Sequence, residues 1–154
     1  MADDSIYAYL AQHPFFKGLG ADYLKLLSAH ASLLQVSAQQ RVFKQDTDAD
    51  KFYVVRSGKV ALEIPAISGE PLRAQTVGDG QLIGWSWLLP PFRWLFDARA
   101  LTASTLIVVD GIALRAACDA DPKLGYDLLR RFAALMSERL SAARLAAIAQ
   151  YSGS

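Results

Sequence analysis

Between Leu33 and Val109 the chain is a succession of short apolar and β-branched runs separated by turn residues, and this stretch constrains the fold most. Runs of this length, repeated between turn residues, are typical of short strands in a roll or barrel. The clearest runs are residues 42–43, 52–56, 60–64, 73–77 and 106–109. The sequence therefore predicts a β-roll over residues 32–110, in a fold that is mainly β with flanking helices.

The clearest hairpin signal in this stretch runs from residue 51 to residue 64. Val60, Leu62 and Ile64 alternate with smaller or charged residues, and a Ser-Gly pair at 57–58 precedes them. Gly58 supplies the positive φ that a tight two-residue turn needs. We therefore expect the runs on the two sides of Gly58 to pair with each other.

Helical periodicity flanks the roll on both sides. Residues 1–31 contain two short amphipathic stretches, at 5–13 and 21–31, with a proline and glycine-rich turn between them. Residues 111–154 are helical in pattern to the end of the chain. A length of 154 residues is usual for one domain, so we treat residues 1–154 as a single domain.

The last helix is unusually long. Asp121 and Pro122 form a good start signal, and only Gly125 interrupts the pattern before about Gln150, which gives roughly 28 residues and about 42 Å. A domain this small cannot cover such a rod along its whole length. An apolar stripe runs along the helix. The part that the domain cannot cover would either pair with the same helix of a second copy or fold back on the roll of its own chain. The residues predicted for the homodimer contact are Leu128, Phe132, Leu135 and Leu140.

Charge and cysteine content exclude several classes of protein. The net charge is +1, from 16 basic and 15 acidic residues, so no global field would draw the protein to nucleic acid or to an anionic membrane. The lone Cys118 excludes an intramolecular disulfide and a cysteine-based zinc cluster. The N-terminus lacks a secretory signal, and no window reaches the about 20 apolar residues of a membrane helix. We expect a cytoplasmic protein.

The order of these elements resembles the cyclic nucleotide-binding domain family, which includes the sensor half of the catabolite activator protein. The resemblance is carried by the leading segment 13–19 (HPFFKGL), by 52–60 (FYVVRSGKV), by the turn 77–84 (VGDGQLIG) and by the long final helix. It implies a double-stranded β-helix, or jelly-roll barrel, with two short N-terminal helices and a long C-terminal helix. It also implies that residues 78–99 correspond to the phosphate-binding cassette of the family.

This cassette-like segment departs from the family pattern, which reads Gly-Glu-x-Ala-Leu followed by an arginine. In the family the glycine and the first turn of a short helix present backbone N–H groups to a phosphate, the arginine neutralises it, and the glutamate accepts from the ribose. Here Gly84 is retained, Trp85 stands in place of the glutamate, and Trp94 occupies the ungapped position of the arginine, beside Arg93. Losing both side chains would weaken cyclic AMP binding about a hundredfold or more. We expect no bound cofactor.

Two hypotheses for the function follow. In the first, the domain is a sensor for a small anionic or nucleotide-like ligand, and the final helix relays binding. Gly84, Trp85 and Ser86 would supply backbone donors and Arg93 would pair with the anion, with Arg99 as a second candidate. In the second, Trp85 and Trp94 fill the pocket, and the protein is a dimeric adaptor or regulatory subunit that binds no ligand.

No set of residues suggests catalysis or a metal site. His13 and His30 lie on the leading segments, Cys118 has no activating neighbour, and Ser86 lacks the Gly-x-Ser-x-Gly setting of a nucleophile. We therefore expect no enzyme and no metal. The arginines of the last helix invite a nucleic-acid interpretation, but family members that bind DNA carry a helix-turn-helix module after this helix, and here the sequence stops at Ser154. We expect Arg130, Arg131, Arg139 and Arg144 to form a solvated face or to dock a partner protein.

Overall fold

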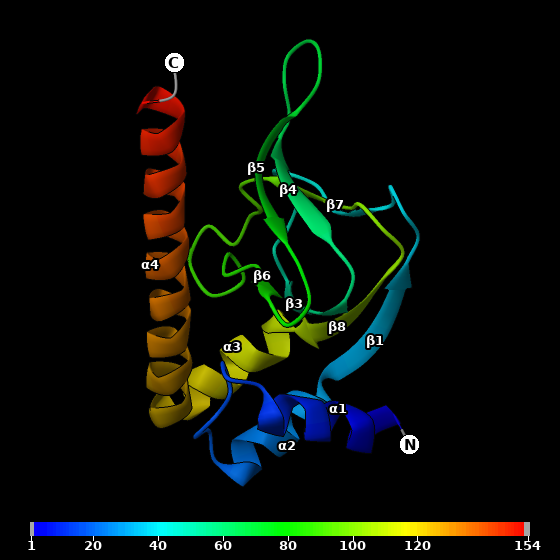
Figure 1. Ribbon diagram of the computed structural model, residues 1–154. Helices are drawn as coiled ribbons and strands as arrows, with labels where there is room; N and C mark the ends of the chain where they lie inside the picture. The colour runs from blue at the N-terminus through cyan, green and yellow to red at the C-terminus, as the bar shows by residue number, and fades with distance from the viewer. Residues whose placement is uncertain (1, 153–154) are drawn as a thin grey trace.

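A computed structural model describes the backbone of residues 2–152 and the side chains of residues 5–149. Within residues 2–152, eight strands form two four-stranded antiparallel sheets, and four helices lie outside them (Figure 1). Within one sheet the order is β1 (Ala31–Val36), β8 (Ser104–Asp110), β3 (Lys51–Ser57) and β6 (Leu82–Ile83). In the other it is β2 (Arg41–Phe43), β7 (Asp97–Ala100), β4 (Val60–Ile64) and β5 (Leu72–Val77). The expectation of a mainly β fold with flanking helices is confirmed.

The four helices are α1 (Ala2–Gln12), α2 (Ala21–Ala29), α3 (Gly111–Ala120) and α4 (Pro122–Ser152). Asp110 caps α3, because its side chain accepts from the backbone N–H groups of Ile112 and Ala113. The long last helix begins at the proline that the sequence marked. In Figure 1 it stands beside the sheets: α3 lies near its N-terminal end, and its C-terminal turns reach the level of the β4–β5 hairpin.

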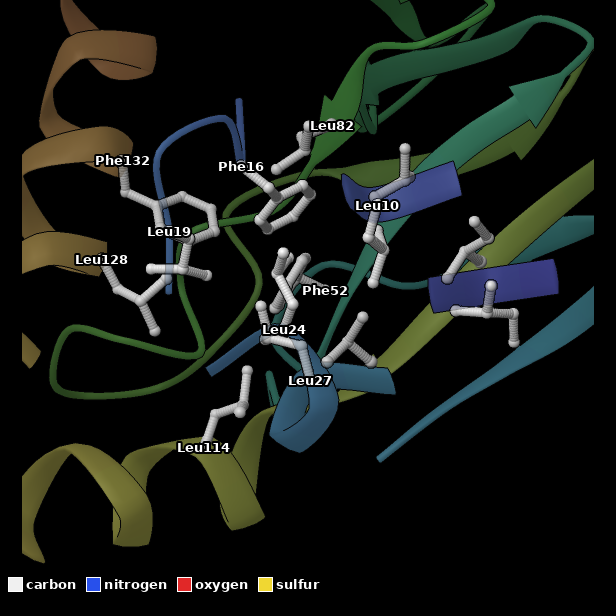
Figure 2. Packing of buried hydrophobic residues seen from close by; sticks show 14 of the residues in the cluster. Leu10, Phe16, Leu19, Leu24, Leu27, Phe52, Leu82, Leu114, Leu128 and Phe132 are labelled. Carbon is white, nitrogen blue, oxygen red and sulfur yellow. The ribbon is translucent and has the colours of Figure 1, made fainter. Parts of the chain in front are cut away.

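Strand β3 lies between two separate hydrophobic cores, and this explains its nearly continuous apolar sequence. Successive side chains of a strand point to opposite faces. Tyr53 and Val55 face the inter-sheet core, the cluster enclosed by the two sheets. Phe52 and Val54 face the outer core, where the sheet packs against all four helices (Figure 2). Each of the four side chains is at most 6% exposed.

The expected hairpin about Gly58 is wrong. β3 pairs with β8 and β6, whereas β4 pairs with β5 and β7 in the other sheet. The Ser-Gly pair therefore makes a corner at which the chain leaves one sheet and enters the other. Gly58 is required there, because its φ is +120° and a Cβ would overlap the side chain of Ser104. Residues of β4 pair with those of β5 instead, so the true hairpin is one strand further along the chain.

The first half of α4 packs in the outer core and its second half does not. Leu124, Leu128 and Phe132 are fully buried within the chain itself. Leu128 and Phe132 were predicted to contact a second copy, and this is corrected, because they have no surface left to offer one. Leu135 is partly buried against the same core, and Leu140 is 65% exposed. Every residue of the helix from 140 to 149 is exposed, so this part of α4 lies beyond the last core contact.

Candidate functional site

The cassette-like segment leaves β6 at Gly84 and reaches β7 at Asp97 without forming a helix. One turn occurs at its start, where the N–H of Leu88 donates to the carbonyl of Trp85 at 3.0 Å. The backbone of Gly84 has φ +97°, and an added Cβ would lie 2.6 Å from the ring of Trp94. Glycine is therefore needed at this position for two reasons: the backbone conformation, and the indole that lies directly against it.

Trp94 occupies the inter-sheet core. Its ring is stacked on that of Phe43, with the centroids 3.7 Å apart and the planes 8° from parallel, and Tyr53 lies 6.3 Å away. Only 3% of Trp94 is exposed. The backbone on both sides of the indole is tied to the loop before β3: Trp94 N–H donates to the carbonyl of Thr47, and its carbonyl accepts from the N–H of Asp46. The side chain that replaces the family arginine thus fills the space that Gly84 faces.

The other two tryptophans of the segment lie in the outer core instead. Trp87 is fully buried between Phe52 and Phe132, with ring centroids 5.3 and 5.5 Å away. Trp85 packs at the edge of the same core, and the guanidinium of Arg139 lies 5.4 Å from its ring centroid. The hypothesis that Trp85 and Trp94 together fill the pocket is therefore corrected: Trp94 lies between the sheets and Trp85 lies on the helical side. Ser86, between Trp85 and Trp87, is 8% exposed.

Arg93 points to a surface loop. Its Nη1 donates to Asp48 Oδ1 at 3.0 Å, and its Nη2 donates to the carbonyl of Asp46. The side chain is 45% exposed and the two aspartates are more exposed still, so this ion pair is screened by solvent. Arg93 precedes Trp94 in the sequence, but its guanidinium contacts the loop at Asp46 and Asp48 and not the inter-sheet core that holds the indole. Contact between Arg93 and an anion stays a prediction.

Arg99 lies on the outer face of β7, since its neighbours Ala98 and Ala100 face the inter-sheet core. It makes a two-fold ion pair with Glu63 of β4, with distances of 3.0 and 2.6 Å. The hydrogen bonds from Arg99 hold the pKa of Glu63 below its usual range. Arg99 therefore has a partner in the chain already. A role in ligand binding stays a prediction for this residue too.

The sequence did not reveal the environment of Arg139, which was expected to belong to a solvated face or to dock a partner protein. Arg139 is 9% exposed, and its Nη2 donates to the carbonyl of Leu82 at the start of β6. Burial lowers the pKa of its guanidinium to about 10. Its position four residues after Leu135, on the same face of α4 as the buried stripe, was the signal available in the sequence.

Among the side chains of residues 5–149 no group of three or more histidine, cysteine or acidic residues is arranged as a metal site. Over the same residues no helix combines the length and apolarity that crossing a membrane requires.

Comparisons with known proteins agree on one fold. A family model described as the cyclic nucleotide-binding domain matches residues 33–121. No curated protein is similar enough in sequence to count as a match. Among solved structures, a putative cyclic nucleotide-binding protein from Geobacter metallireducens is similar with a TM-score of 0.78 and 22% identity, over 91% of this chain and 98% of that one. The N-terminal domain of a Streptomyces coelicolor transcriptional regulator is similar with a TM-score of 0.68 and 26% identity, over 86% of this chain and 93% of that one. The sensor domain of the transcriptional regulator DNR from Pseudomonas aeruginosa is similar with a TM-score of 0.74 and 19% identity, over 90% of this chain and 93% of that one.

Proposed function

Because the chain belongs to the cyclic nucleotide-binding domain family, we propose that it is a regulatory domain whose nucleotide pocket is closed by its own Trp94. The observation that carries this proposal is the stack of Trp94 on Phe43 against Gly84. In the resemblance described above, the cassette glycine faces the phosphate of the ligand. Here it faces an indole, so a cyclic nucleotide could enter only by displacing a buried aromatic side chain. No catalytic activity is proposed.

Displacing Trp94 would cost more free energy than a cyclic nucleotide could readily supply here. Expelling the indole would expose on the order of 150–250 Å² of apolar surface, which at about 25 cal/mol per Å² is roughly 4–6 kcal/mol. A cyclic nucleotide would have to supply this free energy without the family glutamate and arginine, each of which contributes about 1.5–3 kcal/mol as a charge-assisted partner. The domain would then regulate through protein contacts rather than through a nucleotide.

Cyclic AMP, cyclic GMP and cyclic dinucleotides are expected to give no saturable heat with this protein at concentrations up to about 1 mM. Isothermal titration calorimetry measures this directly. A second candidate function, a sensor in which Arg93 pairs with an anion, predicts the opposite: saturable heat that Arg93→Ala removes. Binding of that kind would overturn the closed-pocket proposal and favour the sensor.

We also propose a homodimer through α4, with a contact surface that differs from the one expected from the sequence. Apolar residues recur along the exposed side of the helix at spacings of three and four, as in a coiled-coil seam. This exposed seam consists of Leu129, Ala133, Met136, Leu140, Ala143 and Ala147. Met136 is partly buried and the others are exposed. A second copy of the helix would cover the leucines, which a single chain leaves 44% and 65% exposed.

Leu140→Glu should weaken dimerisation at least tenfold, by about 1.4 kcal/mol or more, because two carboxylates would meet in an apolar seam. Sedimentation equilibrium over a range of concentrations gives the dissociation constant. Leu145→Glu is the matched control: Leu145 is 68% exposed but lies about 140° further round the helix, so its substitution should leave the constant unchanged. A monomeric parent protein, or equal effects of the two substitutions, would contradict the dimer proposed here.

A further inference from the structure

A groove of about 1020 Å³ lies outside the two sheets, and the proposed function makes no use of it. Its walls are α4, the end of α1 with the turn that follows, and the turn between β5 and β6. Much of the lining is apolar, and it includes Tyr9, Pro14, Phe15, Leu82, Leu135 and Ala142.

Arg139 lines this groove, and no described carboxylate forms an ion pair with it, although the negative charge of the neighbouring Glu138 acts on it at longer range. Nη2 donates to the carbonyl of Leu82, whereas Nη1 is buried and has no hydrogen-bond partner among the described residues. No ion pair to Arg139 occurs among the described side chains, and its face contact with Trp85 supplies only a weak partner. The guanidinium remains charged at neutral pH, since its pKa is about 10. Burying a guanidinium without a carboxylate partner costs free energy, and a hydrogen-bond acceptor for Nη1 of Arg139 is missing.

Two of the remaining charged residues of the groove, Arg131 and Asp79, already have partners, and Glu138 is exposed. Arg131 pairs with Asp127 at 2.6 Å and donates to the carbonyls of Phe15 and Lys17. Asp79 accepts from the N–H of Gly58 at 2.8 Å. Asp79 and the exposed Glu138 nevertheless add two negative charges to the lining, which disfavours a dianion such as phosphate. The groove therefore suits a ligand with one negative charge and an apolar body.

We propose that the groove binds a small apolar monocarboxylate, whose carboxylate pairs with Arg139 and whose hydrocarbon body lies against Phe15 and Leu135. A planar carboxylate matches the two terminal nitrogens of a guanidinium. Because Nη1 is covered in the free chain, the guanidinium turns from Trp85 toward the groove when the acid binds. The site is separate from the inter-sheet core, so it goes beyond the proposed function and does not depend on it.

The test compares 1-naphthoate with its neutral analogue 1-naphthamide, and with inorganic phosphate, by calorimetry on the full chain. We expect saturable binding of the acid below about 10 mM, at least tenfold tighter than the amide, and no binding of phosphate. Backbone amide shifts should map the acid to residues 79–82 and 135–142. Arg139→Met should abolish the preference for the acid over the amide. Arg144→Met, an exposed arginine on the same helix that does not line the groove, should retain it.

Arg139→Met should fold, because methionine fills a similar apolar volume and removes an unpaired buried charge. Its thermal midpoint without ligand should be equal to or above that of the parent, which separates a ligand role from a structural one. Equal affinities for acid and amide, absence of saturable acid binding, or an acid preference that survives Arg139→Met would each overturn the proposal. Amide shifts confined to Phe43, Tyr53 and Trp94 would instead place the acid in the inter-sheet core and count against the closed pocket as well.

Discussion

Trp94→Ala is expected to lower the free energy of unfolding by about 3–5 kcal/mol, as do other deletions of a fully packed aromatic side chain. The substitution removes the stack on Phe43 and leaves a cavity between the sheets that the close backbone strands cannot fill by moving together. Urea denaturation followed by circular dichroism measures the change. The free energy comes from the midpoint and the slope of the transition, provided that the slope stays the same.

Leu95→Ala is the matched control, because Leu95 is the next residue and is 65% exposed. Its substitution should change the free energy of unfolding by no more than about 0.5 kcal/mol. Indole added to Trp94→Ala should raise its thermal midpoint and should not raise that of the parent, since an apolar cavity of this shape accepts the fragment that was removed. A loss under about 1 kcal/mol for Trp94→Ala would mean that the indole does not fill the core.

Gly84→Ala is expected to be the second most damaging change, at about 2–4 kcal/mol, from two separate causes. The backbone at φ +97° is unfavourable for a residue with a Cβ, and the new methyl would lie 2.6 Å from the ring of Trp94. The same denaturation experiment measures the loss.

A double-mutant cycle with Trp94→Ala separates the two causes. Only the contact with the ring disappears in the background that lacks the indole, so Gly84→Ala should cost about 1–2 kcal/mol there, the backbone part alone. Equal costs in the two backgrounds would show that the methyl and the indole do not meet, and would remove the geometric basis of the closed pocket.

The β-rich centre and the flanking helices could be predicted because hydrophobic periodicity reports which faces are buried. Which strands pair with each other in a sheet could not be predicted in this way. β3 is apolar on both faces, and a run of this kind is equally compatible with a hairpin and with a wall between two cores. Gly58 indicates a sharp turn in either case, so the sequence could not tell a hairpin from a corner between sheets.

The candidate site shows the same division. The departure at residues 85 and 94 was visible from the resemblance, and the structure buries one of the two tryptophans, Trp94, against Gly84. The directions of the two rings were not visible, because a segment without regular structure has no periodicity that assigns a face. Arg139 was missed for a related reason. Counting arginines along α4 gives the charge of the helix, whereas the burial of one of them depends on β6 and Trp85, which are distant in sequence.

The position of β3 between two cores has a mechanical consequence. Tyr53 lies near Trp94 on one side of the strand, and Phe52 lies near Phe132 of α4 on the other, so a single peptide bond separates the two environments. A movement of the Trp94 indole would push on β3, which is the only strand between it and the side chains of α4 on the opposite face of the sheet. In the proposed closed pocket, Trp94 is therefore separated by one strand from the aromatic side chains through which α4 packs on the sheet.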